Sequence, residues 1–393
     1  MFSPAAHALD LNRRLHLGQL VQSPMQLGTW AVLEPAGPQN HAPQLCWLSQ
    51  DQLGCVWMAG GQEGTAGMRI VLSTLRRGGR RWSRPRSISQ DGERSEQNPL
   101  LFVSKSETGT SRLQLIHTAQ RVRKQDEASE DGSPFSMQWT AVLRRQQRAQ
   151  RGGRWSTAQD LLDIPAFCRH PPHQLEDGRW LLPIYRSLEA GGAFGHDHSE
   201  LLLLNADGSP TDEVIPIPQS TGRVHGSLVL SADGNQLLQF FRSRQADCIY
   251  RSTGSIDGKH WSPPEPIPLP NNNSSIQALR LRSGRLAMIF NRFNLQSEPA
   301  SEETWGEAFW PRTRWPLSVA LSDDDGDTWP WVRDLDHGDG FAGDANWFLN
   351  GQLAYPSIVE GLPGELHIAY SWAGRQAIRY LHLMEEQILG ILQ

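Results

Sequence analysis

Hydrophobic residues along the chain come in short runs that are separated by glycine-containing turns. Six segments repeat one plan, in which an apolar or period-two run leads through a turn into a second apolar run: residues 41–61, 97–119, 169–187, 224–244, 273–292 and 354–372. This pattern is typical of a β-hairpin. The glycines assigned to the turns lie 50 to 80 residues apart: Gly54, Gly109, Gly178, Gly234, Gly284 and Gly364. Each interval leaves room for a second hairpin.

A shorter repeat, Gly-x-x-Trp, occurs between these hairpins at 79–82, 152–155, 258–261 and 326–329. The last copy ends the acid-rich octapeptide SDDDGDTW, residues 322–329. Three aspartates could hold a cation, or the segment could be a turn that its own side chains stabilise. Because the copies that end at Trp82 and Trp155 lack the acidic residues, we predict hairpin turns in which the tryptophan packs on the core.

Two hairpins per unit in six units predict an all-β protein with the fold of a six-bladed β-propeller. No helical period competes with this pattern anywhere in the 393 residues. We therefore expect one propeller domain over residues 38–393. The N-terminal segment, residues 1–37, is expected to complete the last blade.

Composition narrows the classes of partner. The net charge is −5, and no run of Lys and Arg is interleaved with aromatic residues, so we expect no nucleic-acid partner. The apolar run at 201–204 has the length of a strand rather than of a membrane span. The first residues lack a basic region followed by an apolar one, so we expect a cytoplasmic protein without membrane association. The four cysteines do not form a disulfide framework.

Polar residues stand just ahead of the first strand of every hairpin. They are His41, Gln97 with Asn98, Arg169 with His170, His225, Asn273 and Tyr355. In a propeller the innermost strands line a central channel, so these side chains should converge. Structural strands have no need of polar residues at one place in every unit, and we interpret the ring as a functional site. The alternative is a rim of solvated side chains.

The residue types of this region suit acid chemistry. Four arginines near the strand ends can present paired donors to a carboxylate: Arg186, Arg242, Arg292 and Arg314. Histidine and tyrosine can move protons, and a tyrosine can attack as a nucleophile when a neighbour takes its proton. Glu63, in the loop GGQEGTAG, is either a general acid or a solvated loop residue.

The side chains of His196-Asp197-His198 are of types that can bind a metal ion. Adjacent strand residues point to opposite faces, so only the two histidines could share an ion. We predict no metal site and no cofactor.

Several strings of the sequence resemble one family. The segments SDDDGDTW, SIDGKHW, NHAPQLCWL, WMAGGQEG, QNPLLF, DGRWLLPIYRS and YPSIVE are similar to those of the sialidase (neuraminidase) superfamily, and in particular to its bacterial BNR-repeat subgroup. The resemblance covers about residues 38–383. It implies a sialidase-like propeller and a glycoside hydrolase activity.

The resemblance also implies roles. Sialidases bind the sialic acid carboxylate with three arginines and use a tyrosine nucleophile paired with a glutamate, and an aspartate acts as acid and base. Arg242 matches the second arginine, Arg314 the third and Tyr355 the nucleophile. Three positions depart from the pattern, since His41 stands at the first arginine, His225 at the glutamate and Glu63 near the aspartate. We expect the Tyr355 hydroxyl within hydrogen-bond reach of His225 or another channel histidine.

Three functions remain open on this reading. The first is an exo-glycosidase that removes a terminal acidic sugar, with His41, His225, Glu63 and Tyr355 as catalytic residues. In this reading Arg242, Arg314, Arg186, Arg292, Asn98 and His170 bind the substrate. The second is a polysaccharide lyase, in which His41, His225 and Tyr355 abstract and return protons on a uronate. The third is a non-catalytic propeller that binds a glycan or a protein. The expected partner in the first two is a carbohydrate.

Overall fold

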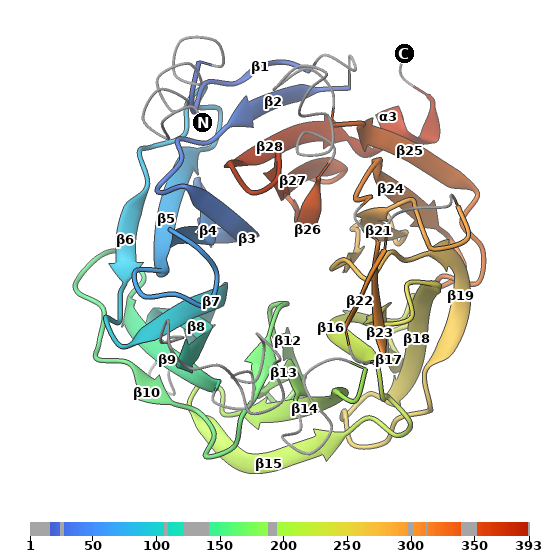
Figure 1. Ribbon diagram of the computed structural model, residues 1–393, viewed down its shortest axis with the longest axis horizontal. Coiled ribbons are helices and arrows are strands. Elements are labelled where there is room, and N and C mark those ends of the chain that lie inside the picture. Colours follow the sequence, from blue (N-terminus) through green and yellow to red (C-terminus); the bar gives the residue numbers. More distant parts are fainter. Residues whose placement is uncertain are drawn as a thin grey trace.

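The computed structural model describes residues 16–23, 27–105, 109–121, 141–187, 195–297, 302–305, 307–311, 313–338 and 352–391. Within these ranges the chain is almost wholly β, and the helix α3 (Glu385–Leu389) is a single short turn. No helix of this described part is long and apolar enough to span a bilayer. Six antiparallel sheets stand around a central axis, which confirms the predicted all-β six-bladed propeller (Figure 1).

The first three blades follow one another along the chain. Their strands, from the inside outward, are β3 (Gln39–Ser49), β4 (Gln52–Gly60), β5 (Arg69–Arg76) and β6 (Arg86–Ser89); β7 (Arg94–Lys105), β8 (Ser111–Arg121), β9 (Val142–Ala149) and β10 (Gln159–Asp160); and β11 (Phe167–Cys168) with β12 (His173–Gln174), β13 (Trp180–Arg186), β14 (His198–Leu204) and β15 (Pro210–Pro216). The inner strand of the third blade is thus split in two, and both pieces pair with β13.

The fourth and fifth blades have the same plan. Their strands are β16 (Arg223–Leu230), β17 (Gln236–Ser243), β18 (Cys248–Ser255) and β19 (Glu265–Pro270), then β20 (Gln277–Arg280), β21 (Leu286–Asn291), β24 (Leu317–Ser322) and β25 (Trp331–Asp336). An additional hairpin, β22 (Glu302–Trp305) and β23 (Ala308–Pro311), is inserted between β21 and β24.

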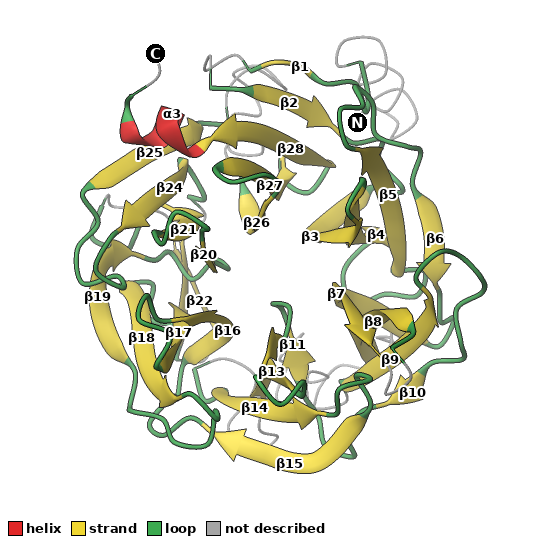
Figure 2. Cartoon of the chain, turned by 180° about the vertical axis from the view of Figure 1, so that it is seen from behind, coloured by secondary structure: helices red, strands yellow, loops and turns green. Residues whose placement is uncertain are grey.

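The sixth blade joins the two ends of the chain. Its inner strands are β26 (Ala354–Glu360), β27 (Glu365–Trp372) and β28 (Ala377–Met384), and its outer strands are β2 (Thr29–Val32) and β1 (Val21–Gln22). Trp30 of β2 lies opposite Leu381 of β28, so hydrogen bonds of the ladder close the ring. The helix α3 follows β28 in the chain, and Figure 2, drawn from the other side, shows it beside β25.

The six predicted hairpins are the two innermost strands of the six blades. Five of the predicted turn glycines have positive φ, as tight turns require: Gly109, Gly178, Gly234, Gly284 and Gly364. The first hairpin differs, because its turn is at Gln50 and Asp51 and Gly54 lies inside β4. A Cβ at Gly54 would lie 3.0 Å from the Leu48 side chain, so packing rather than turn geometry favours glycine there.

Large apolar side chains fill the spaces between adjacent blades. Trp57 of the first blade is completely buried, and it belongs to a cluster that includes Tyr380 of the sixth. Phe240 and Phe290 join the fourth and fifth blades in the same way. This packing holds the sheets at fixed angles, so that residues at the ends of the inner strands have fixed positions.

The octapeptide 322–329 is a turn that its own side chains stabilise. Asp324 Oδ1 accepts a hydrogen bond from the backbone N–H of Thr328 at 2.9 Å, and Trp329 Nε1 donates to the Gly326 carbonyl at 3.1 Å. In the shortened copy, Asp257 Oδ1 accepts from the Lys259 N–H at 3.1 Å. The repeated tryptophans differ in burial, since Trp82 is buried and the other three are half-buried.

Replacing Asp324 should affect stability but not catalysis. Asp324→Ala removes the acceptor of the Thr328 N–H and hydroxyl bonds, and we expect a loss of about 1 kcal/mol in the free energy of unfolding. Asp323→Ala is the matched control, since this exposed side chain makes only a 3.6 Å ion pair with Arg285. Urea unfolding of both variants measures the difference, and equal losses would contradict a stabilising role of the Asp324 bonds.

Candidate active site

In five of the six blades a residue in the inner strand or just ahead of it has positive φ. These residues are Ala42 (54°), Asn98 (49°), His225 (56°), Asn273 (54°) and Tyr355 (53°). The ladder register shifts at this point in four blades, for example between Val224 and Ser227. A bulge of this kind turns a side chain away from its regular direction, and positive φ at non-glycine residues clusters at functional sites.

The bulges explain why the predicted ring contains polar residues. The bulges lie at one end of the propeller, where the inner strands begin, and we call this end the site face. In the third blade the break between β11 and β12 replaces the bulge and contains Arg169 and His170. In the first blade the positive φ belongs to Ala42, the residue after His41.

Tyr355 and Arg242 form the centre of the site. Arg242 Nη1 donates to the Tyr355 hydroxyl at 2.9 Å, and Arg242 Nε donates to Asn273 Oδ1 at 2.6 Å. Arg242 is only 1% exposed, so these bonds hold its guanidinium in one orientation. Sequence analysis predicted a histidine beside the hydroxyl, and this is wrong: His225 Nε2 lies 3.4 Å from Arg242 Nη1, and no hydrogen bond joins His225 to the Tyr355 hydroxyl.

Histidine rings surround the tyrosine ring instead. His41 lies 4.2 Å from it, centroid to centroid, and His225 packs edge-on at 5.3 Å. Ser371 Oγ is 2.8 Å from His41 Nδ1, and Ser275 Oγ is 3.0 Å from His225 Nδ1. Ser275 also lies 3.4 Å from His170 Nε2, so a chain of polar contacts reaches the third blade.

A buried arginine lies behind the tyrosine. Arg169 is 1% exposed, and its guanidinium lies 5.3 Å from the centre of the Tyr355 ring. Its Nη2 donates to the Tyr355 carbonyl at 2.8 Å and to the Pro43 carbonyl at 3.1 Å. Burial lowers the pKa of Arg169 to about 10, which leaves the group positive at neutral pH. Arg169 therefore fixes the strained Tyr355 backbone and brings positive charge close to the ring.

A carboxylate and two more arginines complete the cluster. Glu63 Oε2 accepts a hydrogen bond from Arg375 Nη1 at 2.5 Å, and both side chains are about one-third exposed, at 35% and 29%. The carbonyl of Arg314 accepts bonds from the Asn291 side chain and the Leu353 N–H, which hold this residue at the site face. Burial lowers the pKa of Arg314 to about 10, and its nearest charges are those of this cluster.

The charges around Tyr355 lower the pKa of its hydroxyl group. Burial raises the pKa of the Tyr355 hydroxyl, but the charges of Arg242, Arg314 and Arg375 lower it by more, and the net pKa lies below 10 although Glu63 opposes the change. Burial, followed by the neighbouring arginines, lowers the pKa values of His41 and His225 well below 6.5. Both imidazoles are therefore neutral at pH 7, and the positive charge at the site belongs to arginine.

The inserted hairpin forms one wall beside Arg242. The Trp310 ring of β23 lies 5.7 Å from the Arg242 guanidinium and 5.1 Å from that of Arg244. The Phe309 carbonyl accepts a hydrogen bond from Asn273 Nδ2 at 2.7 Å, which fastens the hairpin to the segment ahead of β20 in the fifth blade. Trp310 thus presents an aromatic surface next to the arginine cluster.

Some predicted site residues lie elsewhere. Arg292 pairs with Asp334 and is 51% exposed, so it does not take part in the cluster. Arg186 forms an ion pair with Glu200 at 3.6 Å. Asn98 occupies the bulge of the second blade, where its Oδ1 is buried and makes no hydrogen bond within the described part of the chain. At the considered metal position, Asp197 is fully buried and pairs with Arg244.

Sequence reasoning missed Arg375. It lies in the turn between β27 and β28, three residues after Trp372, which ends a strand at the site face. The sequence pattern could have indicated Arg375. The turn after β27 lies at the end of the blade where β26 begins, which is the end that contains Tyr355. Four segments far apart in the sequence, around residues 63, 242, 314 and 375, thus bring charged side chains to Tyr355.

Comparisons with known proteins agree with this architecture. The sequence model of the family described as "BNR repeat-like domain" matches residues 51–368. Among curated proteins, none matches the sequence. Solved structures match by fold at low identity.

Three of these structures illustrate the similarity. A Hadza microbial sialidase is 14% identical, with a TM-score of 0.65 over 89% of this chain and 66% of that chain. A protein of unknown function from Dyadobacter fermentans is 14% identical, with a TM-score of 0.67 over 90% and 97%. The Trypanosoma rangeli sialidase, solved as a covalent intermediate with 2,3-difluorosialic acid, is 10% identical, with a TM-score of 0.64 over 96% and 58%. The chain thus spans less than two thirds of the length of either sialidase.

Proposed function

Because this chain belongs to the BNR repeat-like domain family and shares the propeller fold of sialidases, we propose that it is a glycoside hydrolase that removes a terminal sugar carrying a carboxylate. One observation carries the proposal. Arg242 donates a hydrogen bond to the Tyr355 hydroxyl at 2.9 Å, and the charges of Arg314 and Arg375 also lower the pKa of this hydroxyl. Such a concentration of positive charge suits an anionic substrate next to a nucleophile.

The arginines bind the carboxylate of the sugar. Arg242 is fixed by Asn273, so its remaining donors have a defined direction. Arg375 is paired with Glu63 in the free protein, and an incoming carboxylate competes for that pair. Binding of an acidic sugar therefore releases Glu63 from Arg375 and leaves its carboxyl group available for proton transfer. A neutral sugar does not produce this exchange.

Tyr355 and Glu63 carry out the chemistry. After its release from Arg375, Glu63 takes up a proton from solvent, and Tyr355 reacts as its phenolate. The Tyr355 oxygen attacks the anomeric carbon while the glycosidic C–O bond breaks, and Glu63 gives its proton to the departing oxygen. Water then attacks the same carbon, Glu63 accepts a proton from it, and the bond to Tyr355 breaks. Arg242 supports both steps because its hydrogen bond and charge favour the Tyr355 phenolate.

Removing the Arg375 charge should weaken binding of acidic sugars selectively. In Arg375→Met the carboxylate loses one cationic partner, and we expect KM to rise about tenfold to a hundredfold, with a smaller change in kcat. Arg292→Met is the matched control, since Arg292 is paired with Asp334 outside the cluster. Steady-state kinetics on one acidic aryl glycoside checks both variants, and an unchanged KM in Arg375→Met would remove Arg375 from the carboxylate site.

A lyase acting on a uronate-containing glycan is the second candidate. It is favoured by the state of His41, whose ring packs on Tyr355 and whose buried Nε2 makes no hydrogen bond within the described residues. A neutral imidazole can take the proton next to a carboxylate that arginines neutralise, while Tyr355 protonates the leaving oxygen. This reaction needs no nucleophilic attack, and its product contains a new double bond.

One experiment separates the candidates. The purified protein is incubated with aryl glycosides of acidic and neutral sugars and with uronate oligosaccharides, while released aglycone and the absorbance of an unsaturated uronate are followed together. Aglycone release from acidic glycosides alone supports the hydrolase. An absorbance increase without aglycone release supports the lyase. If neither signal appears although an oligosaccharide binds, the protein is a binding propeller and the proposed hydrolase is wrong.

A further inference from the structure

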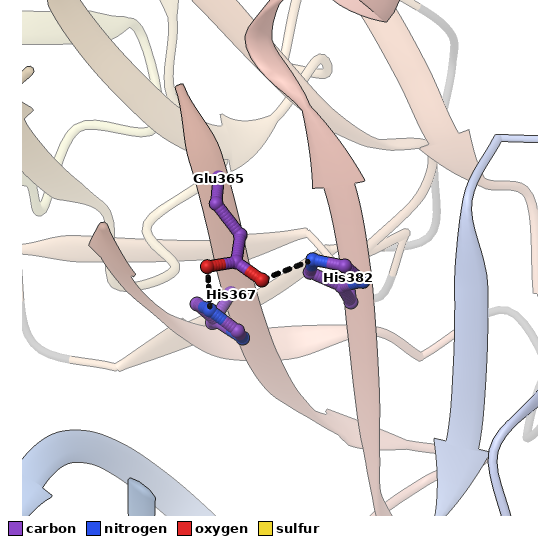
Figure 3. A group of neighbouring side chains, drawn as sticks. All are labelled: Glu365, His367 and His382. Atoms are coloured by element: carbon purple, nitrogen blue, oxygen red, sulfur yellow. Dashed lines mark ion pairs between the residues drawn. The ribbon is translucent and has the colours of Figure 1, made fainter. Parts of the chain in front are cut away.

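A second group of side chains with chemical potential lies at the opposite end of the sixth blade. Tyr355 and Arg375 are at the site face, whereas Glu365 and His367 are at the start of β27, after the turn that reverses the chain. His382 lies directly opposite His367 in the neighbouring strand β28. Figure 3 shows the three side chains converging on one side of the sheet.

Strand geometry explains why they meet. Residues two apart on a strand point to the same face, so Glu365 and His367 share a face of β27. Cross-strand partners in an antiparallel ladder also share a face, which adds His382. Their ligand atoms all lie within 4.8 Å of one another.

Both imidazoles lie at ion-pair distance from the carboxylate, as the dashed lines of Figure 3 mark. His382 Nε2 is 3.0 Å from Glu365 Oε1, and His367 Nε2 is 3.7 Å from Glu365 Oε2. Both Nε2 atoms are buried, and neither makes a hydrogen bond within the described part of the chain. The His367 side chain is only 7% exposed, so its Nε2 has no access to bulk water. Buried polar nitrogens in this state are uncommon and point to an additional ligand.

Two neighbours prepare the group for an ion. His367 Nδ1 lies 2.6 Å from the Tyr380 hydroxyl, and when Nδ1 donates to that oxygen, Nε2 is the nitrogen with a free lone pair. Gly361 leaves the space beside the ligand atoms open. A Cβ at this position would lie 2.5 Å from Glu365 Oε2 and 2.6 Å from His367 Nε2, which is about where a bound ion belongs.

From this geometry we propose that Glu365, His367 and His382 form a Zn²⁺ site. Two imidazole nitrogens and one carboxylate are a common donor set for zinc, and tetrahedral ligands about 2.1 Å from the ion are about 3.4 Å apart. The observed separations of 3.0 and 3.7 Å require only small side-chain shifts. Water from the exposed side of Glu365 supplies the fourth ligand.

The proposed site has a structural role. Its ligands come from β27 and β28, and His382 also lies opposite Thr29 of β2 in the sheet that closes the ring. Zinc at this position would cross-link the sixth blade next to the closing strand, away from Tyr355. The proposal is therefore independent of the proposed hydrolase.

The competing explanation is a hydrogen-bonded cluster that takes no metal. Glu365 Oε2 accepts a bond from the Leu362 N–H at 2.9 Å, and Arg77 Nη1 lies 3.6 Å from the same oxygen. In this explanation Glu365 also pairs with both imidazoles, although neither Nε2 atom has the geometry of a hydrogen bond. Titration with the metal itself decides between the two.

The experiment uses the full chain, treated with a chelator, dialysed, kept reduced and titrated with zinc sulfate by calorimetry. We expect one saturable equivalent per chain. At a free zinc concentration a hundred times Kd, Tm should rise by about 3 °C for a chain of this length. His382→Ala and Glu365→Gln should raise Kd about a hundredfold or more, since loss of even an outer-sphere partner costs tenfold to a hundredfold.

Two further variants keep the test decisive. Gly361→Ala places a methyl group at the proposed ion position without removing a ligand, and it should also abolish the saturable binding of zinc. His260→Ala removes an exposed histidine of the 255–261 turn and should retain it. Thermal unfolding without zinc establishes that each variant is folded. No saturable binding by the parent protein, or equal binding by folded His382→Ala and Gly361→Ala, would overturn the proposal.

Discussion

Tyr355→Phe is expected to reduce turnover of a cleaved acidic glycoside about a thousandfold or more, because the variant has no oxygen to attack the anomeric carbon. The ring should keep its packing against His41 and Arg169, since neither contact uses the hydroxyl. Only the hydrogen bond from Arg242 is lost, and Arg242 retains Asn273. The free energy of unfolding should therefore fall by only about 1 kcal/mol. Single-turnover kinetics and urea unfolding measure the two effects.

Tyr185→Phe is the matched control for this result. Tyr185 is also a buried tyrosine near the site, 5.1 Å from the His225 ring, but burial raises its pKa well above the usual value. Its loss should change turnover less than tenfold. Full activity of Tyr355→Phe on a substrate that the parent cleaves would exclude the nucleophile role. A defect confined to elimination would move Tyr355 into the lyase reaction.

The second large effect is expected at Glu63. If Glu63 protonates the leaving oxygen, Glu63→Gln should slow cleavage of an alkyl glycoside by about a hundredfold to ten-thousandfold. An aryl glycoside with a very acidic phenol leaves without a proton, so its first step should slow by less than about tenfold. The burst of aglycone should then be followed by slow turnover, because the water also lacks its base.

Gln62→Ala provides the control in the same loop, since Gln62 is exposed and only its backbone carbonyl is hydrogen-bonded to Thr65. Gln62→Ala should cleave both the alkyl and the aryl glycoside at the rates of the parent protein. Equal losses on alkyl and aryl glycosides in Glu63→Gln would mean that Glu63 acts through Arg375 alone, as a positioning residue.

The fold could be predicted from the sequence because strand pairing repeats. Six apolar hairpins at similar spacing can bury their faces only against each other, so local pattern and global architecture agree. Gly54 shows the limit: a glycine inside a strand and a glycine in a turn look alike in sequence, and only the contact with Leu48 separates them.

The site was harder to predict, since contacts between blades depend on bulges. The repeated plan of the hairpins placed Tyr355 and Arg242 at the same end. The Tyr355 hydroxyl contacts Arg242 rather than His225, because positive φ at Tyr355 and at His225 turns these two side chains. Arg292 shows the opposite error. It follows a strand that ends at the site face, yet Asp334 of the outer strand holds it outside the cluster.

The repeated bulges have a consequence for how this protein could change its chemistry. At each bulge one side chain is turned out of the regular direction of its strand. The backbone of that residue is held by the rest of the blade rather than by regular pairing in the ladder. Equivalent positions of five blades in one rigid propeller are thus occupied by Ala42, Asn98, His225, Asn273 and Tyr355. Asn98 makes no hydrogen bond to Arg242 within the described part of the chain and can be exchanged by itself, whereas a change at His225, Asn273 or Tyr355 also alters the surroundings of Arg242. For engineering, a library restricted to Asn98, His225, Asn273 and Tyr355 would vary the polar side chains of the site and leave Ala42, which is part of the core, unchanged.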